Sequence, residues 1–200
     1  MSVALRRPWT IQQFLAWEER QALRYEFDGI QPVAMTGGTI AHDRIKINLS
    51  AALVVRLRGT PCRPHGSDVK VEAGSSIRYP DAFVSCSPTD PRATIARDPV
   101  VIFEVLSAST AIVDRIVKNQ EYCAIASVQR YVMLEQERVA ATVFERQGND
   151  WIGHVLTDDA VLAMPEIGCE IPLAELYDGI DLTIAPDPEE PAGGNAGQHG

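Results

Sequence analysis

Two carboxylates stand in or beside apolar stretches, where an isolated charge would be costly. Glu104 lies within PVVIFEVLS, and Asp81 lies within IRYPDAFVS, directly after Pro80. An ionised carboxylate buried alone either destabilises the fold or takes up a proton, so each of these needs a basic side chain, hydrogen-bond donors or a metal ion. Two carboxylates that share a site repel each other unless a cation bridges them, and Mg²⁺ prefers oxygen ligands. The pair therefore predicts a Mg²⁺ site, for which Mn²⁺ is a possible substitute.

A cationic side chain for these carboxylates is available on a predicted helix. The segment TAIVDRIVKNQEYCAI places Asp114 and Lys118 four residues apart, on one helical face. As a surface salt bridge this pair would contribute only about 0–1 kcal/mol. If Lys118 instead points toward the carboxylates, it can hold a water or stabilise the charge that develops on a phosphate. A plainer alternative makes Lys118 only a structural ion-pair partner of Glu104, which leaves Asp81 unexplained.

Three more residues are candidates on weaker grounds. Glu26, in YEFDGI, is a candidate ligand or water-positioning group, although a lone Glu in an alternating strand more often faces solvent. His42 stands in the first turn of a predicted helix, where a neutral imidazole can contact a substrate or ligand, or simply lie on the surface. Arg44 follows in the segment 43–78, which carries seven Lys and Arg against three acids. That segment is either a phosphate-facing surface or a solvated helix face with loops.

The elements that must position these residues follow from periodicity and capping. Thr10 and Gln13 form a capping-box pattern for a helix at about 11–22, and the chain turns around Gly29 as a hairpin. Helices are also expected from Thr39 to about 58 and over about 110–125. The remaining strands are SDVKVEA, IRYPDAFVS, VVIFEVLS, RYVMLEQ, AATVFER and WIGHVLT.

Two of these strands carry positional information. VVIFEVLS is nearly all apolar and β-branched, which is typical of a central strand covered on both faces. Pro80 cannot donate to a ladder, so its strand is expected at an edge or bulged at that point. The order of elements predicts an α/β fold with helices packed on a central mixed sheet.

Composition limits the class of protein. The 200 residues suit one domain, expected over 1–185, and the Pro-, Gly- and acid-rich segment 186–200 is expected to be disordered. No apolar run approaches the ~18 residues of a membrane span, and the N-terminus has no signal-peptide core, so we expect a soluble cytoplasmic protein. Four widely spaced cysteines without a CxxC pair indicate free thiols rather than a zinc site.

The charge distribution leaves a nucleic-acid partner open. The net charge is −9, which argues against such a partner, but all 18 Lys and Arg lie at or before Arg146. Of the 27 acids, 16 lie in that same stretch and 11 follow it. The first 146 residues are therefore slightly basic, and the acidic excess belongs to the C-terminal part.

Five short motifs, in order, carry a family resemblance. YEFDGI, MTGGTIAHDRI, YPDAFV, FEVLSAST and DRIVKNQEY resemble the Uma-type restriction-endonuclease family of the PD-(D/E)XK nuclease superfamily, over about residues 10–145. The resemblance implies a restriction-endonuclease-like fold and metal-dependent cleavage of DNA phosphodiesters. It implies that Asp81 and Glu104 bind Mg²⁺, that Glu26 completes the site, and that a lysine assists the attacking water.

One departure from the superfamily pattern bears on that lysine. Leu106 stands two residues after Glu104, where the superfamily has Lys, and in the Uma-type family a helix lysine takes its place, which here is Lys118. Ala108 replaces a proline that many relatives carry, which bears on a loop rather than on the chemistry.

Two readings of function follow from the sequence. In the first, the protein is a DNA endonuclease in which His42 and basic residues such as Arg44 contact the nucleic-acid backbone, and a homodimer supplies two sites for two strands. In the second, it is a nuclease-fold module with a weakened site that acts through protein contacts, which the acidic C-terminal part favours.

Overall fold

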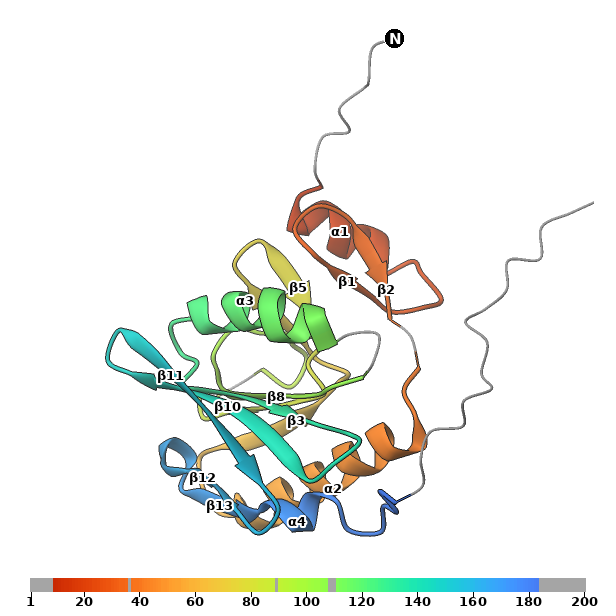
Figure 1. Ribbon diagram of the computed structural model, residues 1–200. Helices are drawn as coiled ribbons and strands as arrows, with labels where there is room; N and C mark the ends of the chain where they lie inside the picture. The colour runs from red at the N-terminus through yellow and green to blue at the C-terminus, as the bar shows by residue number, and fades with distance from the viewer. Residues whose placement is uncertain (1–8, 36, 89, 108–110, 184–200) are drawn as a thin grey trace, which may run out of the picture.

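The computed structural model describes residues 9–35, 37–88, 90–107 and 111–183. Its centre is a six-stranded sheet in the order β11-β10-β9-β8-β6-β3 (Figure 1). β8 pairs antiparallel with β6 and parallel with β9, so the sheet is mixed and β8 is an interior strand, as its sequence predicts. The bounds are β3 (Arg63–Gly66), β6 (Ala82–Ser85), β8 (Pro99–Val105), β9 (Arg130–Leu134), β10 (Ala140–Gln147) and β11 (Asp150–Thr157). The predicted domain boundary at 185 and the tail 186–200 lie outside the described residues.

A second sheet, with the order β2-β1-β5-β4-β7, carries the N-terminal part of the chain. Its first two strands form the hairpin predicted around Gly29, in which Glu26 pairs with Val33. The bounds are β1 (Tyr25–Phe27), β2 (Pro32–Ala34), β4 (Lys70–Ala73), β5 (Ser76–Arg78) and β7 (Ile95–Ala96). Helix α1 (Ile11–Glu18) begins with the predicted capping box and packs Phe14 against Phe27 and Ile77.

The stretch around Pro80 differs from its prediction as a single strand. β5 ends at Arg78 in the five-stranded sheet, and β6 begins at Ala82 in the six-stranded sheet. Pro80 is therefore at neither an edge nor a bulge of one strand; it lies where the chain crosses between two sheets. The missing N–H of proline is tolerated there because no ladder needs it. The crossing places Asp81 directly before an interior strand.

The two faces of β8 meet different partners. Val101, Phe103 and Val105 belong to the core that contains α2 (Ile40–Arg56) and the C-terminal elements. Ile102 and Leu106 belong to the core on the opposite face. Because side chains alternate along a strand, Glu104 lies on this second face. The C-terminal elements, which the sequence reading did not identify, are β12 (Val161–Met164), η2 (Pro165–Ile167), β13 (Cys169–Pro172) and α4 (Leu173–Leu176).

The predicted third helix covers that second face. It runs as a π-helix, η1 (Val113–Lys118), that continues into α3 (Asn119–Ala124). Figure 1 shows this helix above the six-stranded sheet, with α2 and α4 below it. The layers therefore are helix, sheet and helix, with the second sheet and α1 on the side of α3.

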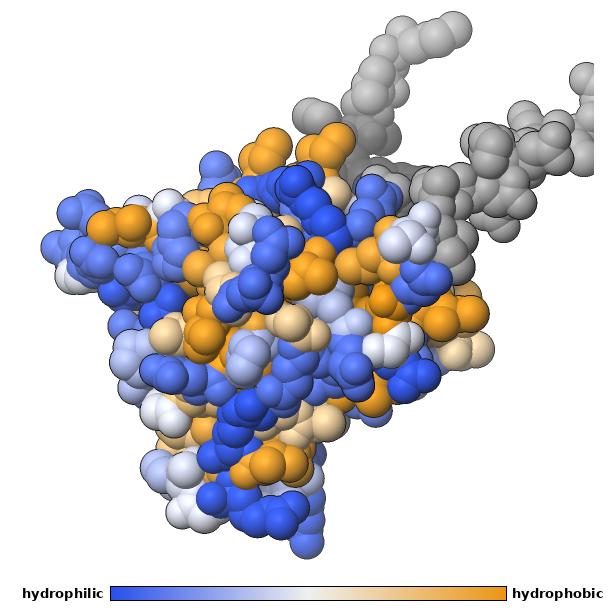
Figure 2. All heavy atoms as spheres, turned by 60° about the horizontal axis from the view of Figure 1, so that its bottom comes forward, coloured by the Kyte–Doolittle hydropathy of each residue, from blue (hydrophilic) through white to orange (hydrophobic). Residues whose placement is uncertain are grey.

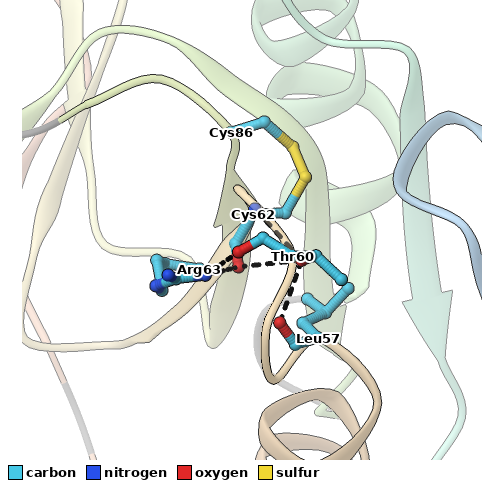
Figure 3. Close-up of a disulfide and its surroundings, with 5 residues drawn as sticks. All are labelled: Leu57, Thr60, Cys62, Arg63 and Cys86. Carbon is cyan, nitrogen blue, oxygen red and sulfur yellow. Dashed lines mark hydrogen bonds between the residues drawn. A yellow bond between two sulfur atoms is a disulfide. The ribbon is translucent and has the colours of Figure 1, made fainter.

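Two of the four cysteines are joined, so the expectation of four free thiols is wrong for these two. Cys62 and Cys86 form a disulfide, whereas Cys123 and Cys169 are free (Figure 3). The reason is the strand register: Arg63 pairs with Ser85, which brings the residues just outside that pair together. A separation of 24 residues in the sequence gives no hint of this contact. Disulfides are rare in reducing compartments, so this one stands in tension with the cytoplasmic expectation.

The surface over α2 and the C-terminal elements is mixed in character. Figure 2 shows apolar residues interspersed with hydrophilic ones on the face turned to the viewer. Within the described residues, no helix is both long enough and apolar enough to cross a bilayer.

Candidate active site

Asp81 and Glu104 come together because β6 and β8 are neighbours. Ala82 pairs with Phe103, so the residue before β6 lies beside the end of β8. The backbone N–H of Val105 donates a hydrogen bond to Asp81 Oδ2 at 2.8 Å, which fixes the carboxylate at this corner. Glu104 is 4% exposed and points toward the helix above. The two carboxylates predicted to share a site thus lie side by side, Glu104 within β8 and Asp81 directly before β6.

Lys118 comes down onto these carboxylates from η1. Its Nζ lies 3.0 Å from Glu104 Oε1, 3.3 Å from Glu26 Oε1 and 3.1 Å from Asp114 Oδ1. Lys118 is only 7% exposed, so its ammonium is a buried charge shared by three carboxylates rather than half of a surface salt bridge. The structural pairing of Lys118 with Glu104 is present, but it involves three carboxylates at once. The π-helical turn, a type of distortion frequent at functional sites, carries both Asp114 and Lys118.

Asp114 is incompletely satisfied in this cluster. Its Oδ1 is buried and has no hydrogen-bond partner within the described part of the chain. The 3.1 Å approach to Lys118 Nζ is therefore a charge contact without hydrogen-bond geometry. A buried carboxylate oxygen without a donor is costly, and it marks a position that a further cation or a water would stabilise.

Asp81 has a different set of basic partners. His42 Nε2 lies 3.3 Å from Asp81 Oδ2, and Lys46 Nζ lies 3.1 Å from Asp81 Oδ1. His42 and Lys46 are four residues apart, so α2 presents both on one face. The sequence reading included Lys46 only in the basic segment; its spacing from His42 was the signal that could have identified it.

Glu26 points into the site rather than into solvent. Its carboxylate accepts a hydrogen bond from the backbone N–H of Tyr79 at 3.0 Å and pairs with Arg78 at 3.2 Å. Arg78 also pairs with Glu121 at 2.7 Å, which ties β5 to α3. This arrangement holds Glu26 beside Lys118 although the two residues belong to different elements, β1 and η1.

Tyr122 completes the surroundings of Glu104. Its hydroxyl donates a hydrogen bond to Glu104 Oε1 at 2.9 Å, and the ring is fully buried. Tyr122 lies four residues after Lys118 and therefore on the same helical face. Sequence reasoning did not select it, because a tyrosine at helical spacing is more often a core residue.

Burial and charge push the carboxylate pKa values in opposite directions. Burial raises the pKa of Glu104 to about 8; Lys118 opposes this effect, and the charges of Asp81, Asp114 and Glu26 reinforce it. Burial also acts to raise the pKa of Asp81, but His42, Lys46 and the Val105 N–H outweigh it, and the pKa lies below its usual value.

The ammonium responds to the same groups. Burial acts to lower the pKa of Lys118, and the charges of Glu104, Glu26 and Asp114 outweigh it, so the pKa is raised. Because Glu104 is partly protonated near neutral pH, Glu26 and Asp114 contribute more of the increase in the pKa of Lys118. The site therefore combines a protonated Lys118 and an ionised Asp81 with Glu104, whose pKa is about 8.

Except for Tyr122 and Glu121, these groups line one cavity of about 790 Å³. It lies where β2, η1 and the N-terminal end of α2 meet above the ends of β6 and β8. Glu26, His42, Asp81, Glu104 and Lys118 all line it. Arg44 does not: it is exposed on α2, two residues from His42 and so on a different face, and its role in nucleic-acid contact stays a prediction.

The donor set fits a hard divalent cation by its chemistry. Carboxylate oxygens are the ligands that Mg²⁺ prefers, and the orphaned Asp114 Oδ1 adds an unsatisfied acceptor. In the arrangement described, the ammonium of Lys118 occupies the space between the carboxylates. Accordingly, no group of three His, Cys, Asp or Glu side chains among the described residues is gathered closely enough to hold a metal as it stands.

Comparison with known proteins gives related sequences and a related structure. The family model Uma2, described as "Putative restriction endonuclease", matches residues 11–174. The Synechocystis sp. (strain PCC 6803) protein slr1290 is 30% identical over 84% of this chain and 91% of its own length. A second protein of that organism, sll1609, is 27% identical over 76% of this chain and 89% of its own length.

The related structure shares the fold. It is described as a "putative nuclease belonging to DUF820" from Anabaena variabilis, and it covers 85% of this chain and 98% of its own, with a TM-score of 0.71 and 17% identity. At that identity the likeness shows the restriction-endonuclease-like fold, which confirms the fold class expected from the sequence.

Proposed function

The chain belongs to the Uma2 family, and on that premise we propose that it is a metal-dependent endonuclease that hydrolyses DNA phosphodiester bonds. The observation that supports this most is the convergence of Glu26, Asp81, Glu104 and Lys118 on one cavity. Hydrolysis consumes one water: a bond forms between the water oxygen and phosphorus, and the bond from phosphorus to a sugar oxygen breaks. The products are a phosphomonoester and a hydroxyl.

The roles of the residues follow from their positions. Asp81 and Glu104, with Glu26 as a third group, would hold Mg²⁺, with Mn²⁺ as a substitute. The chemistry that Mg²⁺ supplies when bound is activation of water and neutralisation of phosphate charge. Lys118 orients the attacking water, and its raised pKa keeps it a hydrogen-bond donor over the physiological range. His42 donates to the substrate phosphate, in the position where it now meets Asp81.

Plasmid cleavage tests this proposal. Supercoiled plasmid is incubated with the protein and Mg²⁺ or Mn²⁺, and nicked and linear products are followed on gels. Glu104→Gln and Lys118→Met should abolish cleavage, whereas Glu137→Gln and Arg138→Met, which change exposed residues on the β9–β10 turn, should retain it. Cleavage that persists equally in all four variants would come from a contaminant and would refute the assignment.

A second function is favoured by one observation. Lys46 pairs with Asp81 and Lys118 pairs with Glu104, so both carboxylates are charge-paired without a metal. A nuclease fold whose site is closed in this way would act through protein contacts. Calorimetric titration separates the two functions: Mn²⁺ binding that is lost in Glu104→Gln supports the nuclease, and absence of binding at millimolar Mn²⁺ supports the protein-contact module.

Homodimerisation belongs to the same proposal. Cutting both strands of a duplex requires two sites, and a pair of chains supplies them. Ile40, Ile47 and Val54 recur every seven residues on α2 and are exposed, which makes this helix face the candidate contact. Sedimentation of the wild type and of Ile47→Asp measures it: a dimer that the substitution dissociates supports the contact.

A further inference from the structure

The cavity that holds the carboxylates also has apolar walls. Val33 comes from β2, and Val113 and Val117 come from η1, two elements far apart in the sequence. These side chains line the cavity and remain 42%, 40% and 42% exposed, respectively. Exposed apolar side chains around a polar centre are typical of ligand sites in which flat or apolar groups are bound above a few polar contacts.

The charge of the lining sets the kind of nucleic acid that can enter. Six carboxylates line the cavity, against three permanently cationic side chains, Lys46, Arg78 and Lys118. All three cations are already paired with carboxylates of the chain. Asp43 lies at the N-terminal end of α2 and is exposed. Such a lining attracts a metal cation, but it does not offer a row of free cations to a phosphate backbone.

A DNA duplex requires such a row. It carries about one negative charge per ~1.7 Å of its axis, and proteins that hold duplexes neutralise several phosphates with Lys and Arg. Elsewhere on the described surface, Arg24, Arg97 and Arg115 are paired with carboxylates of the same chain, whereas Arg44 and Arg58 are exposed without a salt bridge to the described residues. The lining of the cavity itself therefore meets the electrostatic requirement for a duplex poorly, whereas one phosphate beside a bound cation would be accommodated.

The size of the cavity leads to the same conclusion. Its volume of about 790 Å³ falls in the range of ~300–1,000 Å³ that is usual for sites of small-molecule dimensions. An unpaired nucleotide has this scale, and its base offers two apolar faces for side chains such as Val33 and Val117. Enzymes that act on single nucleotides of a strand commonly hold the base between aromatic or apolar side chains.

From these observations we propose that the site takes an unpaired nucleotide within a DNA strand, so that the substrate is single-stranded DNA rather than an intact duplex. The base lies against Val33 and Val117, and the phosphate lies over Glu104 and Lys118. The inference rests on the proposed nuclease function and specifies its substrate class. A single strand requires a single site, so for this substrate one copy of the chain is sufficient for cleavage and the two-strand argument for a dimer does not apply.

Fluorescence anisotropy with the full chain tests the binding step. Ca²⁺ replaces Mg²⁺ to suppress cleavage, and two labelled probes of about 12 nucleotides per strand are compared: a single strand and a hairpin duplex with the same sequence. The single strand should bind at least about tenfold more tightly than the duplex. Val33→Asp and Val117→Asp should each weaken single-strand binding by about tenfold or more. Val155→Asp, an equivalent change at an exposed valine of β11, should not.

The outcomes separate this inference from the proposed function. Cleavage and binding that favour the duplex, or single-strand binding unchanged in Val33→Asp and Val117→Asp, would overturn the inference and leave the nuclease standing. Absence of Mn²⁺ binding together with absence of Mn²⁺-dependent cleavage of either probe would overturn both. A free mononucleotide that competes as well as the strand would also overturn it, because the ligand would then not be a strand. Unfolding measurements on each Asp variant exclude loss of the fold as the cause.

Discussion

Replacing Lys118 by methionine tests how the carboxylate cluster is held together. The substitution keeps the length of the side chain and removes the ammonium that lies within 3.3 Å of Glu26, Glu104 and Asp114. Removing one partner of a buried ion pair costs about 3–5 kcal/mol, because the other charge is left uncompensated. Three carboxylates would be left here, but Glu104 can take up a proton, which limits the loss. We therefore expect Lys118→Met to lower the free energy of unfolding by about 3 kcal/mol at neutral pH without metal.

A divalent cation should reverse most of this loss. With Lys118 gone, Mn²⁺ no longer competes with the ammonium for the carboxylate oxygens, and binding to the folded state alone stabilises it. At a concentration of about 100 times the dissociation constant, such binding contributes about 2.7 kcal/mol. Urea denaturation of the variant with and without Mn²⁺ measures this recovery, which should exceed that of the wild type. A circular dichroism spectrum shows whether the variant is folded before the titration.

Two further variants control this experiment. Arg138→Met removes a cation that is 71% exposed in its side chain and pairs at 3.8 Å, so its cost should be below about 1 kcal/mol. Adding Glu104→Gln to Lys118→Met should change the free energy of unfolding little at neutral pH, because Glu104 is already protonated once the Lys118 ammonium is gone. If Lys118→Met costs no more than Arg138→Met, the cluster does not depend on Lys118.

Three other perturbations give measurable results. Glu104 loses its proton at a pH of about 4.5 in the unfolded chain and at a pH of about 8 in the folded chain. The free energy of unfolding should therefore fall as pH rises between these two values, by up to about 1.4 kcal/mol per pH unit. Urea denaturation measures this profile, and Glu104→Gln should flatten it. Lys46→Met removes the cation 3.1 Å from Asp81 and should tighten Mn²⁺ binding about tenfold in calorimetry; unchanged or weaker binding would contradict this. Cys86→Ser should lower the free energy of unfolding by about 3 kcal/mol under oxidising conditions and have little effect with a thiol reductant present.

Much of the candidate site could be anticipated from local chemistry. Glu104 stands out because a charge in a run of β-branched residues needs a partner, and the helical spacing of Asp114 and Lys118 supplied one. The structure brings Glu104, Asp114 and Lys118 to the same cavity, together with Glu26 and His42. Their metal-binding and catalytic roles stay predictions, because positions alone do not show a bound ion.

The contacts that sequence reasoning missed depend on how elements far apart in the sequence pack together. Lys46 reaches Asp81 only because α2 packs below β6, and Arg78 meets Glu121 only because β5 lies beside α3. The change of sheet at Pro80 has the same origin: an apolar run interrupted by proline reads as one bent strand until both sheets are known. Local periodicity predicts elements well, whereas the pairing of elements is decided by the packing of the whole chain.

The crossing between the two sheets has a consequence for how such proteins diverge. Glu104 and Asp81 sit at the ends of interior strands of the six-stranded sheet, where most substitutions would disturb the core. Val33 belongs to a short surface hairpin of the other sheet, which tolerates changes of length and sequence. We expect relatives that keep the carboxylates but carry a different β1–β2 hairpin to prefer different substrates. Differences in substrate specificity between relatives should then map to the β1–β2 hairpin, and exchanging this hairpin between relatives should transfer the substrate preference.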